Sequence, residues 1–132
     1  MKCIIVDDEN LARSIMAQLC HDAPELEVVA QLPDAVEALK YLNQHKVDVM
    51  FLDIHMPFLT GIDLVHTLKT PPKVVFTTSD KEFALMAYEY EFIVDYLVKP
   101  ITHERFKKTL HKLSAALPPS LEEDTLSGAA QE

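Results

Sequence analysis

Five short apolar runs alternate along this chain with segments whose apolar residues recur at helical spacing. The runs are nearly continuous and rich in β-branched residues, at positions 3–6, 26–32, 47–52, 74–78 and 94–98. Such runs are typical of strands that are covered on both faces, as in a parallel sheet. The helical spacing occurs in residues 11–19, 36–42, 59–68, 82–91 and 106–117. We expect these apolar stripes to pack on the sheet.

The order of strand and then helix, repeated five times, predicts a three-layer α/β domain with right-handed crossovers. A length of 132 residues suits one domain with a sizeable core. From Leu117 onward the periodicity is lost, and Pro118 and Pro119 end the last helix. We therefore predict residues 1–117 as the folded domain and residues 118–132 as an acidic linker or a disordered tail.

The composition excludes several classes of function. The chain has 12 Lys and Arg against 21 Asp and Glu, a formal net charge of −9, so no broad basic surface for nucleic acid is expected. No apolar run approaches the length of a membrane span. The two glycines, Gly61 and Gly128, are too few and too far apart for a Walker loop or a G-x-G-x-x-G fingerprint.

The two cysteines indicate a reducing compartment. Cys3 lies in an apolar run and Cys20 near the end of a helical segment, which favours buried, reduced thiols over a disulfide. The N-terminal apolar run is too short for a signal peptide. Together these features predict a cytoplasmic location.

Polar residues follow four of the five predicted strands, at the point where each strand ends. They are Asp7 and Asp8 after the first run, Asp53 after the third, Thr77, Thr78 and Ser79 around the end of the fourth, and Lys99 after the fifth. In open parallel sheets, ligands bind outside the carboxyl ends of the strands. The second run contributes no such residue, which fits a strand at the edge of the sheet.

Three carboxylates in one crevice indicate a bound cation, because unbalanced acids repel one another and become protonated. Mg²⁺ typically binds one or two carboxylates, waters and a phosphate. Lys99 and the Thr78 hydroxyl could donate to phosphoryl oxygens. Asp53 then has the position of a carboxylate nucleophile that forms an acyl phosphate. Taken alone, Asp53 could also be a solvated strand end or a helix cap.

The segments IIVDDE (4–9), DVMFLDIHMP followed by Gly61, FTTS (76–79) and DYLVKP (95–100) resemble the receiver domain of two-component response regulators. The resemblance covers residues 2–117. It implies a CheY-like, doubly wound, flavodoxin-like parallel sheet with strand order 2-1-3-4-5. It also implies a switch phosphorylated by a sensor histidine kinase or a phosphorelay protein, rather than an enzyme acting on a separate substrate.

The resemblance assigns roles to individual residues. Asp53 is the phosphoacceptor, and Mg²⁺ is bound by Asp7, Asp8, Asp53 and the backbone carbonyl of His55. Thr78 is the switch hydroxyl, Lys99 pairs with the phosphoryl group, and Tyr96 is the switch aromatic. The simpler alternatives are a rim position for His55 and a fixed packing role for Tyr96. The Lys99–Pro100 peptide bond is expected to be cis, which an X-Pro bond adopts at little cost.

The sequence of residues 76–100 is most similar to that of receivers that are attached to LytTR-type DNA-binding domains. This implies a LytTR output domain, and a homodimer through the surface of the fourth helix, fifth strand and fifth helix. Many receivers carry a glycine shortly before the switch aromatic. This chain lacks that glycine, and so do LytTR-type members.

An enzyme is the main alternative, namely a Mg²⁺-dependent phosphatase or phosphotransferase with an aspartyl nucleophile. Enzymes of the haloacid dehalogenase type require D-x-D after the first strand, whereas this chain has Asp7-Asp8 there. A receiver-like module that only docks partners would require lost site residues, and none is lost.

Overall fold

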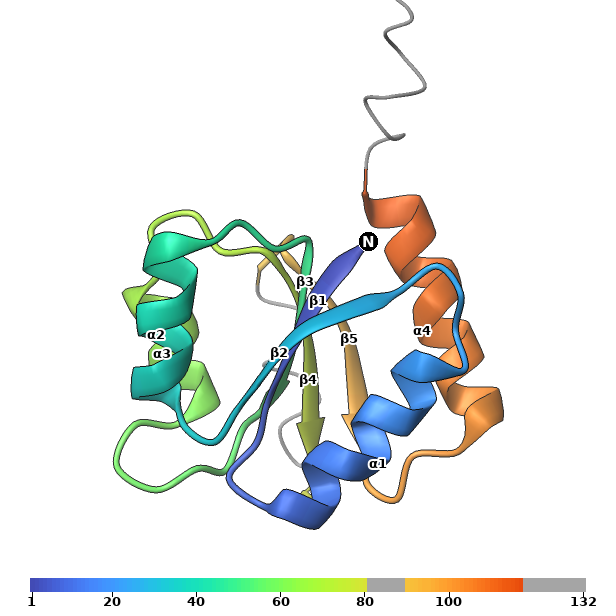
Figure 1. Ribbon diagram of the computed structural model, residues 1–132, viewed down its shortest axis with the longest axis horizontal. Coiled ribbons are helices and arrows are strands. Elements are labelled where there is room, and N and C mark those ends of the chain that lie inside the picture. The colour runs from blue at the N-terminus through green and yellow to red at the C-terminus, as the bar shows by residue number, and fades with distance from the viewer. Residues whose placement is uncertain (81–89, 118–132) are drawn as a thin grey trace, which may run out of the picture.

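The computed structural model describes residues 1–80 and 90–117, in which a five-stranded sheet lies between two layers of helices (Figure 1). The elements are, in chain order, β1 (Lys2–Val6), α1 (Asn10–His21), β2 (Glu27–Leu32), α2 (Ala35–Gln44), β3 (Val49–Asp53), α3 (Gly61–Thr67), β4 (Lys73–Thr78), β5 (Ile93–Val98) and α4 (His103–Ala116). All four strand pairings are parallel, and the order is β2-β1-β3-β4-β5. The predicted fold class and strand order are therefore confirmed, with β2 at the edge.

Two cores form on the two faces of the sheet, because successive side chains of a strand point to opposite faces. Helices α1 and α4 cover one face and α2 and α3 the other (Figure 1). The first core includes Ile5, Phe51, Leu97, Phe106 and Leu113. The second includes Ile4, Met50, Phe76, Leu64 and Tyr96. The near-continuous apolar runs thus supply both cores at once.

Three of the helices begin with a side-chain cap. Asp34 accepts a hydrogen bond from the Glu37 N–H at 2.8 Å at the start of α2, and Thr102 accepts one from the Arg105 N–H at 3.1 Å at the start of α4. At α3, Thr60 and Asp63 form a reciprocal capping box. Each cap satisfies a backbone N–H of the first helical turn and defines where the helix starts.

Gly61 allows α3 to begin directly against the end of β3. A Cβ atom at this position would clash with the carbonyl oxygen of Asp53 and lie 3.1 Å from its carbonyl carbon. Both are backbone atoms that cannot move aside. The absence of a side chain at Gly61 therefore keeps the loop after Asp53 short and close to the sheet.

Some predictions about the helices need correction. Leu11, Ile15 and Val36 were expected to face the core, but they are 73%, 48% and 52% exposed. The stripe on α1 packs through Met16 and Leu19, farther along the helix. Most of the predicted helix 82–91 and the predicted tail 118–132 lie outside the described residues. Residues 90 and 91 form a bend and turn before β5.

Two further predictions from sequence, the reduced thiols and the cis peptide bond, are confirmed. Cys3 and Cys20 are both free and buried. The Lys99–Pro100 bond is cis. Within residues 1–80 and 90–117, no helix combines the length and hydrophobicity needed to cross a bilayer.

Candidate functional site

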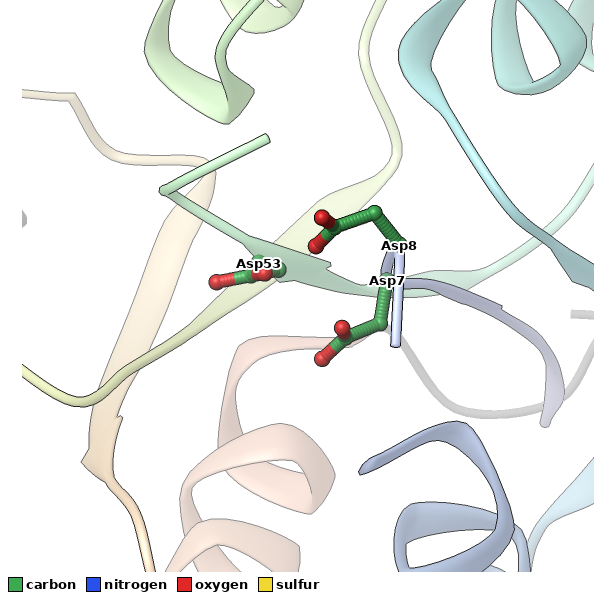
Figure 2. A group of neighbouring side chains, drawn as sticks. All are labelled: Asp7, Asp8 and Asp53. Atoms are coloured by element: carbon green, nitrogen blue, oxygen red, sulfur yellow. The ribbon is translucent and has the colours of Figure 1, made fainter. Parts of the chain in front are cut away.

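Three carboxylates meet at the carboxyl ends of two adjacent strands (Figure 2). Asp7 and Asp8 directly follow β1, and Asp53 is the last residue of β3. One carboxylate oxygen from each lies within 4.8 Å of those of the other two. Asp7 and Asp53 are each only 4% exposed, whereas Asp8 is exposed. The structure therefore brings Asp53 to Asp7 and Asp8, which precede it in the sequence by 46 and 45 residues.

Lys99 joins this cluster from the end of β5. Its Nζ lies 2.8 Å from Asp7 Oδ2, 3.8 Å from Asp53 Oδ2 and 4.0 Å from Glu9 Oε1. Burial lowers the pKa of Lys99, but the hydrogen bond to Asp7 and the charge of Asp53 outweigh burial and raise the pKa above its ordinary value. Lys99 therefore carries a permanent positive charge beside the acids.

The electrostatics of Asp53 show that one lysine does not balance the cluster. Burial raises the pKa of Asp53 from 3.8 to about 7, and the charge of Asp7 adds to the rise. Lys99 and the N–H of His55, which donates to Asp53 Oδ1 at 3.2 Å, only partly oppose it. A further cation among these oxygens would favour the charged carboxylate. Hard oxygen ligands of this kind suit Mg²⁺.

The remaining predicted site residues surround the cluster. Thr78 is fully buried at the end of β4, and its hydroxyl accepts a hydrogen bond from the Asp80 N–H at 3.0 Å. Tyr96 is 6% exposed on β5, and its hydroxyl donates to the Asp80 carbonyl oxygen. The His55 side chain lies at the rim, half exposed, with Nε2 4.0 Å from Asp80 Oδ2. Asp80 thus links Thr78, Tyr96 and His55.

A second network of charged residues, around Asp95, was not predicted from the sequence. Asp95, on β5, has no exposed surface and accepts hydrogen bonds from Arg105, Lys112 and Thr109 of α4. Burial raises the pKa of Asp95, but these bonds more than offset it and lower the pKa to about 2. Arg105 also donates to the carbonyl oxygen of Tyr96 at 3.1 Å. The sequence does contain a signal for this network, namely an acid inside the apolar run 94–98. A buried acid requires a partner that donates hydrogen bonds to it.

The chain was compared with known protein families and structures. Residues 3–111 match the family described as the response regulator receiver domain, a span that contains every residue of the acidic cluster and Lys99. An uncharacterized response regulatory protein of Vibrio cholerae is 43% identical over 115 residues. The transcriptional regulatory protein BtsR of Salmonella typhi is 42% identical over 115 residues. Both alignments cover 86% of this chain and 48% of the relative, so the chain spans about half the length of these relatives.

Solved structures share the fold. The response regulatory domain of mrkE from Klebsiella pneumoniae is 39% identical with a TM-score of 0.78, covering 88% of this chain and 97% of that one. A response regulator receiver domain protein from Clostridium thermocellum is 26% identical with a TM-score of 0.72, covering 85% and 92% of the two chains. Sequence and structure comparisons thus agree on the family.

Proposed function

This chain belongs to the response regulator receiver family of two-component systems, and on that premise we propose that it is switched by phosphorylation of Asp53. The observation that carries the proposal is the convergence of Asp7, Asp8 and Asp53 within 4.8 Å, beside the Lys99 amine. A sensor histidine kinase or a phosphorelay protein would supply the phosphoryl group. Receiver domains are signalling domains, and we propose that this one assists its own phosphorylation and dephosphorylation.

The site supports this chemistry through charge and position. An Asp53 oxygen would bond to phosphorus as the P–N bond of a phosphohistidine breaks, with the electron pair returning to the imidazole nitrogen. Asp7, Asp8, Asp53 and the carbonyl of His55 would hold Mg²⁺, which supplies positive charge to the phosphoryl oxygens. Lys99, already within 3.8 Å of Asp53, would pair with a phosphoryl oxygen.

Thr78 and Tyr96 would carry the signal from the site to the surface. A phosphoryl group adds charge and strong acceptor oxygens at Asp53. The Thr78 hydroxyl would turn toward one of these oxygens, and Tyr96 would change its rotamer in response. Such a side chain with two arrangements is the bistable element that a switch requires. Amide exchange with beryllofluoride bound tests this model, which fails if changes never reach residues 82–106.

The output would leave through the surface of the predicted fourth helix, β5 and α4, which we also propose as the face of a homodimer. Relatives such as BtsR are transcriptional regulators about twice as long as this chain. We therefore propose that residues 1–117 form the receiver, that residues 118–132 are a linker, and that a LytTR-type DNA-binding domain acts as the output. The net charge of −9 opposes direct contact of the receiver with DNA. Two free thiols support a cytoplasmic location.

Mass spectrometry after treatment with acetyl phosphate tests the phosphoacceptor. We expect a phosphoryl adduct on the wild type that requires Mg²⁺ and is absent from Asp53→Asn. Asp63→Asn is a suitable control, because Asp63 is an exposed acid of α3 that caps the helix outside the cluster. Undiminished labelling of the Asp53 variant would contradict the assignment.

A further inference from the structure

Phe58, in the loop between β3 and α3, combines full exposure with an unusual backbone. Its side chain is 104% exposed, the largest value among the exposed hydrophobic residues of the described part of the chain. Its φ angle is 68°, and the Leu59 N–H donates to the Pro57 carbonyl across it at 2.8 Å. A positive φ with this bond is a γ-turn of the rare, strained type. Phe58 is also the only non-glycine with positive φ among the described residues.

The fold gains nothing from a phenylalanine at this position. A residue with a Cβ atom is disfavoured at positive φ, where glycine or asparagine would fit better. The ring does not compensate for the strain by packing, because none of its surface is buried. Strained positions that persist without a structural benefit often serve binding or catalysis. Phe58 is therefore a candidate contact residue.

The loop holds Phe58 in a fixed place. Ile54 and Met56 are 2% and 5% exposed and anchor the loop in the core. The Gly61 N–H donates to the Ile54 carbonyl at 2.9 Å and closes the loop at its base. Because the backbone of the loop is already anchored, little backbone entropy is lost when the exposed ring docks.

Apolar surface also lies beside the acidic cluster. A cavity of about 400 Å³ is lined by Leu11 and Ile15 of α1 and by Pro100 and Ile101, and Asp7 and Lys99 of the cluster line it too. Asp53 therefore lies at the same edge of the sheet as two apolar features. A protein that brings a reactive side chain to Asp53 must cover this edge.

We infer that Phe58 is an anchor residue for the protein that donates the phosphoryl group to Asp53, an inference that rests on the proposed function. The donor must bring its phosphohistidine within bonding distance of Asp53, and Phe58 lies only five residues after Asp53, in the loop that follows β3. The partner surface would offer an apolar pocket for the ring. The residues around that pocket would be neutral to basic, which complements the net charge of −9 on this chain.

Transfer kinetics from a purified, autophosphorylated sensor histidine kinase that labels the wild type test this inference. Phe58→Gly removes the ring and suits the positive φ, while Phe58→Trp keeps an aromatic ring. We expect Phe58→Gly to lower the transfer rate at subsaturating receiver by about tenfold or more, as loss of an interface anchor does. Phe58→Trp should restore most of the rate. The melting temperature of Phe58→Gly should be no lower than that of the wild type.

Acetyl phosphate and a second apolar truncation provide the controls. All variants should be labelled by acetyl phosphate at the wild-type rate, because a small donor needs no docking surface. Val36→Ala, an exposed apolar position on α2, should leave kinase transfer unchanged. The inference would be overturned if Phe58→Gly accepted the phosphoryl group from the kinase at the wild-type rate. It would also be overturned if Phe58→Gly lost as much of its labelling rate with acetyl phosphate, or if Val36→Ala lost as much of its kinase transfer rate. If Phe58→Gly changed the oligomeric state but accepted the phosphoryl group at the normal rate, the inference would also be overturned. The partner of Phe58 would then be a second copy of this chain. Failure of acetyl phosphate to label wild-type Asp53 would instead contradict the proposed function.

Discussion

The Lys99 amine donates a hydrogen bond to Asp7 Oδ2 at 2.8 Å, although the two residues are 92 positions apart in sequence. The contact joins the ends of β1 and β5, which are not neighbours in the sheet. The same amine lies 3.8 Å from Asp53 Oδ2 on β3, which is one of the two strands between them. Lys99 therefore offsets part of the negative charge of the cluster, and a cation would compete with it for Asp7.

Replacing Lys99 by methionine should tighten Mg²⁺ binding. The substitution removes a positive charge a few ångströms from the proposed Mg²⁺ ligands and frees Asp7 Oδ2, so we expect the Kd for Mg²⁺ to fall by about tenfold. Titration calorimetry at fixed ionic strength measures the change. Lys40→Met, at an exposed position on α2, should leave the Kd unaltered. Weaker binding in the Lys99 variant would mean that the amine positions the ligands instead of opposing the cation.

Replacing Asp53 by asparagine should alter how stability depends on pH in metal-free protein. The pKa of Asp53 in the folded state, about 7, lies above its ordinary value of 3.8. A group of this kind favours the folded state below pH 3.8, and the contribution is lost as pH rises toward 7. We expect the free energy of unfolding of the wild type to fall across this range and that of Asp53→Asn to fall less. Urea unfolding at several pH values measures both.

Added Mg²⁺ serves as the matched control for that comparison. The proposed function has Mg²⁺ bind the carboxylates of the folded state, so the ion should stabilise the wild type at neutral pH more than Asp53→Asn. The wild type and the variant could instead show the same dependence of the unfolding free energy on pH and the same response to Mg²⁺. That result would contradict the repulsion between carboxylates that we infer from the structure.

Replacing Asp95 by asparagine should destabilise the fold at neutral pH, on the order of 2–4 kcal/mol, because Arg105 and Lys112 lose a buried anionic partner. The pKa of Asp95 is lowered to about 2 from 3.8. Its contribution is therefore present above pH 3.8 and is lost as pH falls toward 2, so the deficit of the variant should shrink there. Glu37→Gln, which removes an exposed ion pair, should cost less than about 1 kcal/mol. A deficit independent of pH would point to lost packing.

Replacing Gly61 by alanine should destabilise the protein by about 2 kcal/mol or more. The new Cβ would overlap the backbone of Asp53 and Ile54, which cannot move without displacing β3. Urea unfolding measures the loss, and Val36→Ala, at an exposed helix position, should change stability by less than about 0.5 kcal/mol. Wild-type stability of the Gly61 variant would show that the loop after Asp53 can relax.

Much of the fold and of the acidic cluster could be predicted from local pattern. Strands and helices follow from the period of the apolar residues, and the parallel arrangement follows from their alternation. The polar residues stood out because they end the apolar runs, and parallel strands end at the same edge of the sheet. The grouping of Asp7, Asp8, Asp53 and Lys99 therefore follows from the sequence alone.

The partners of Asp95, the exposure of Leu11 and the backbone of Phe58 could not be read from the chain. Asp95 is bound by residues of the following helix, and which side chains reach it depends on how α4 crosses β5. Leu11 repeats at the spacing of the core stripe, yet it is exposed at the start of α1, whereas Met16 and Leu19 farther along the helix are buried. Phe58 has its positive φ within the loop that the hydrogen bond from the Gly61 N–H to the Ile54 carbonyl closes. Periodicity reports which face of an element is apolar, but packing angles and loop closure are set by contacts between elements, and only the tertiary structure contains those.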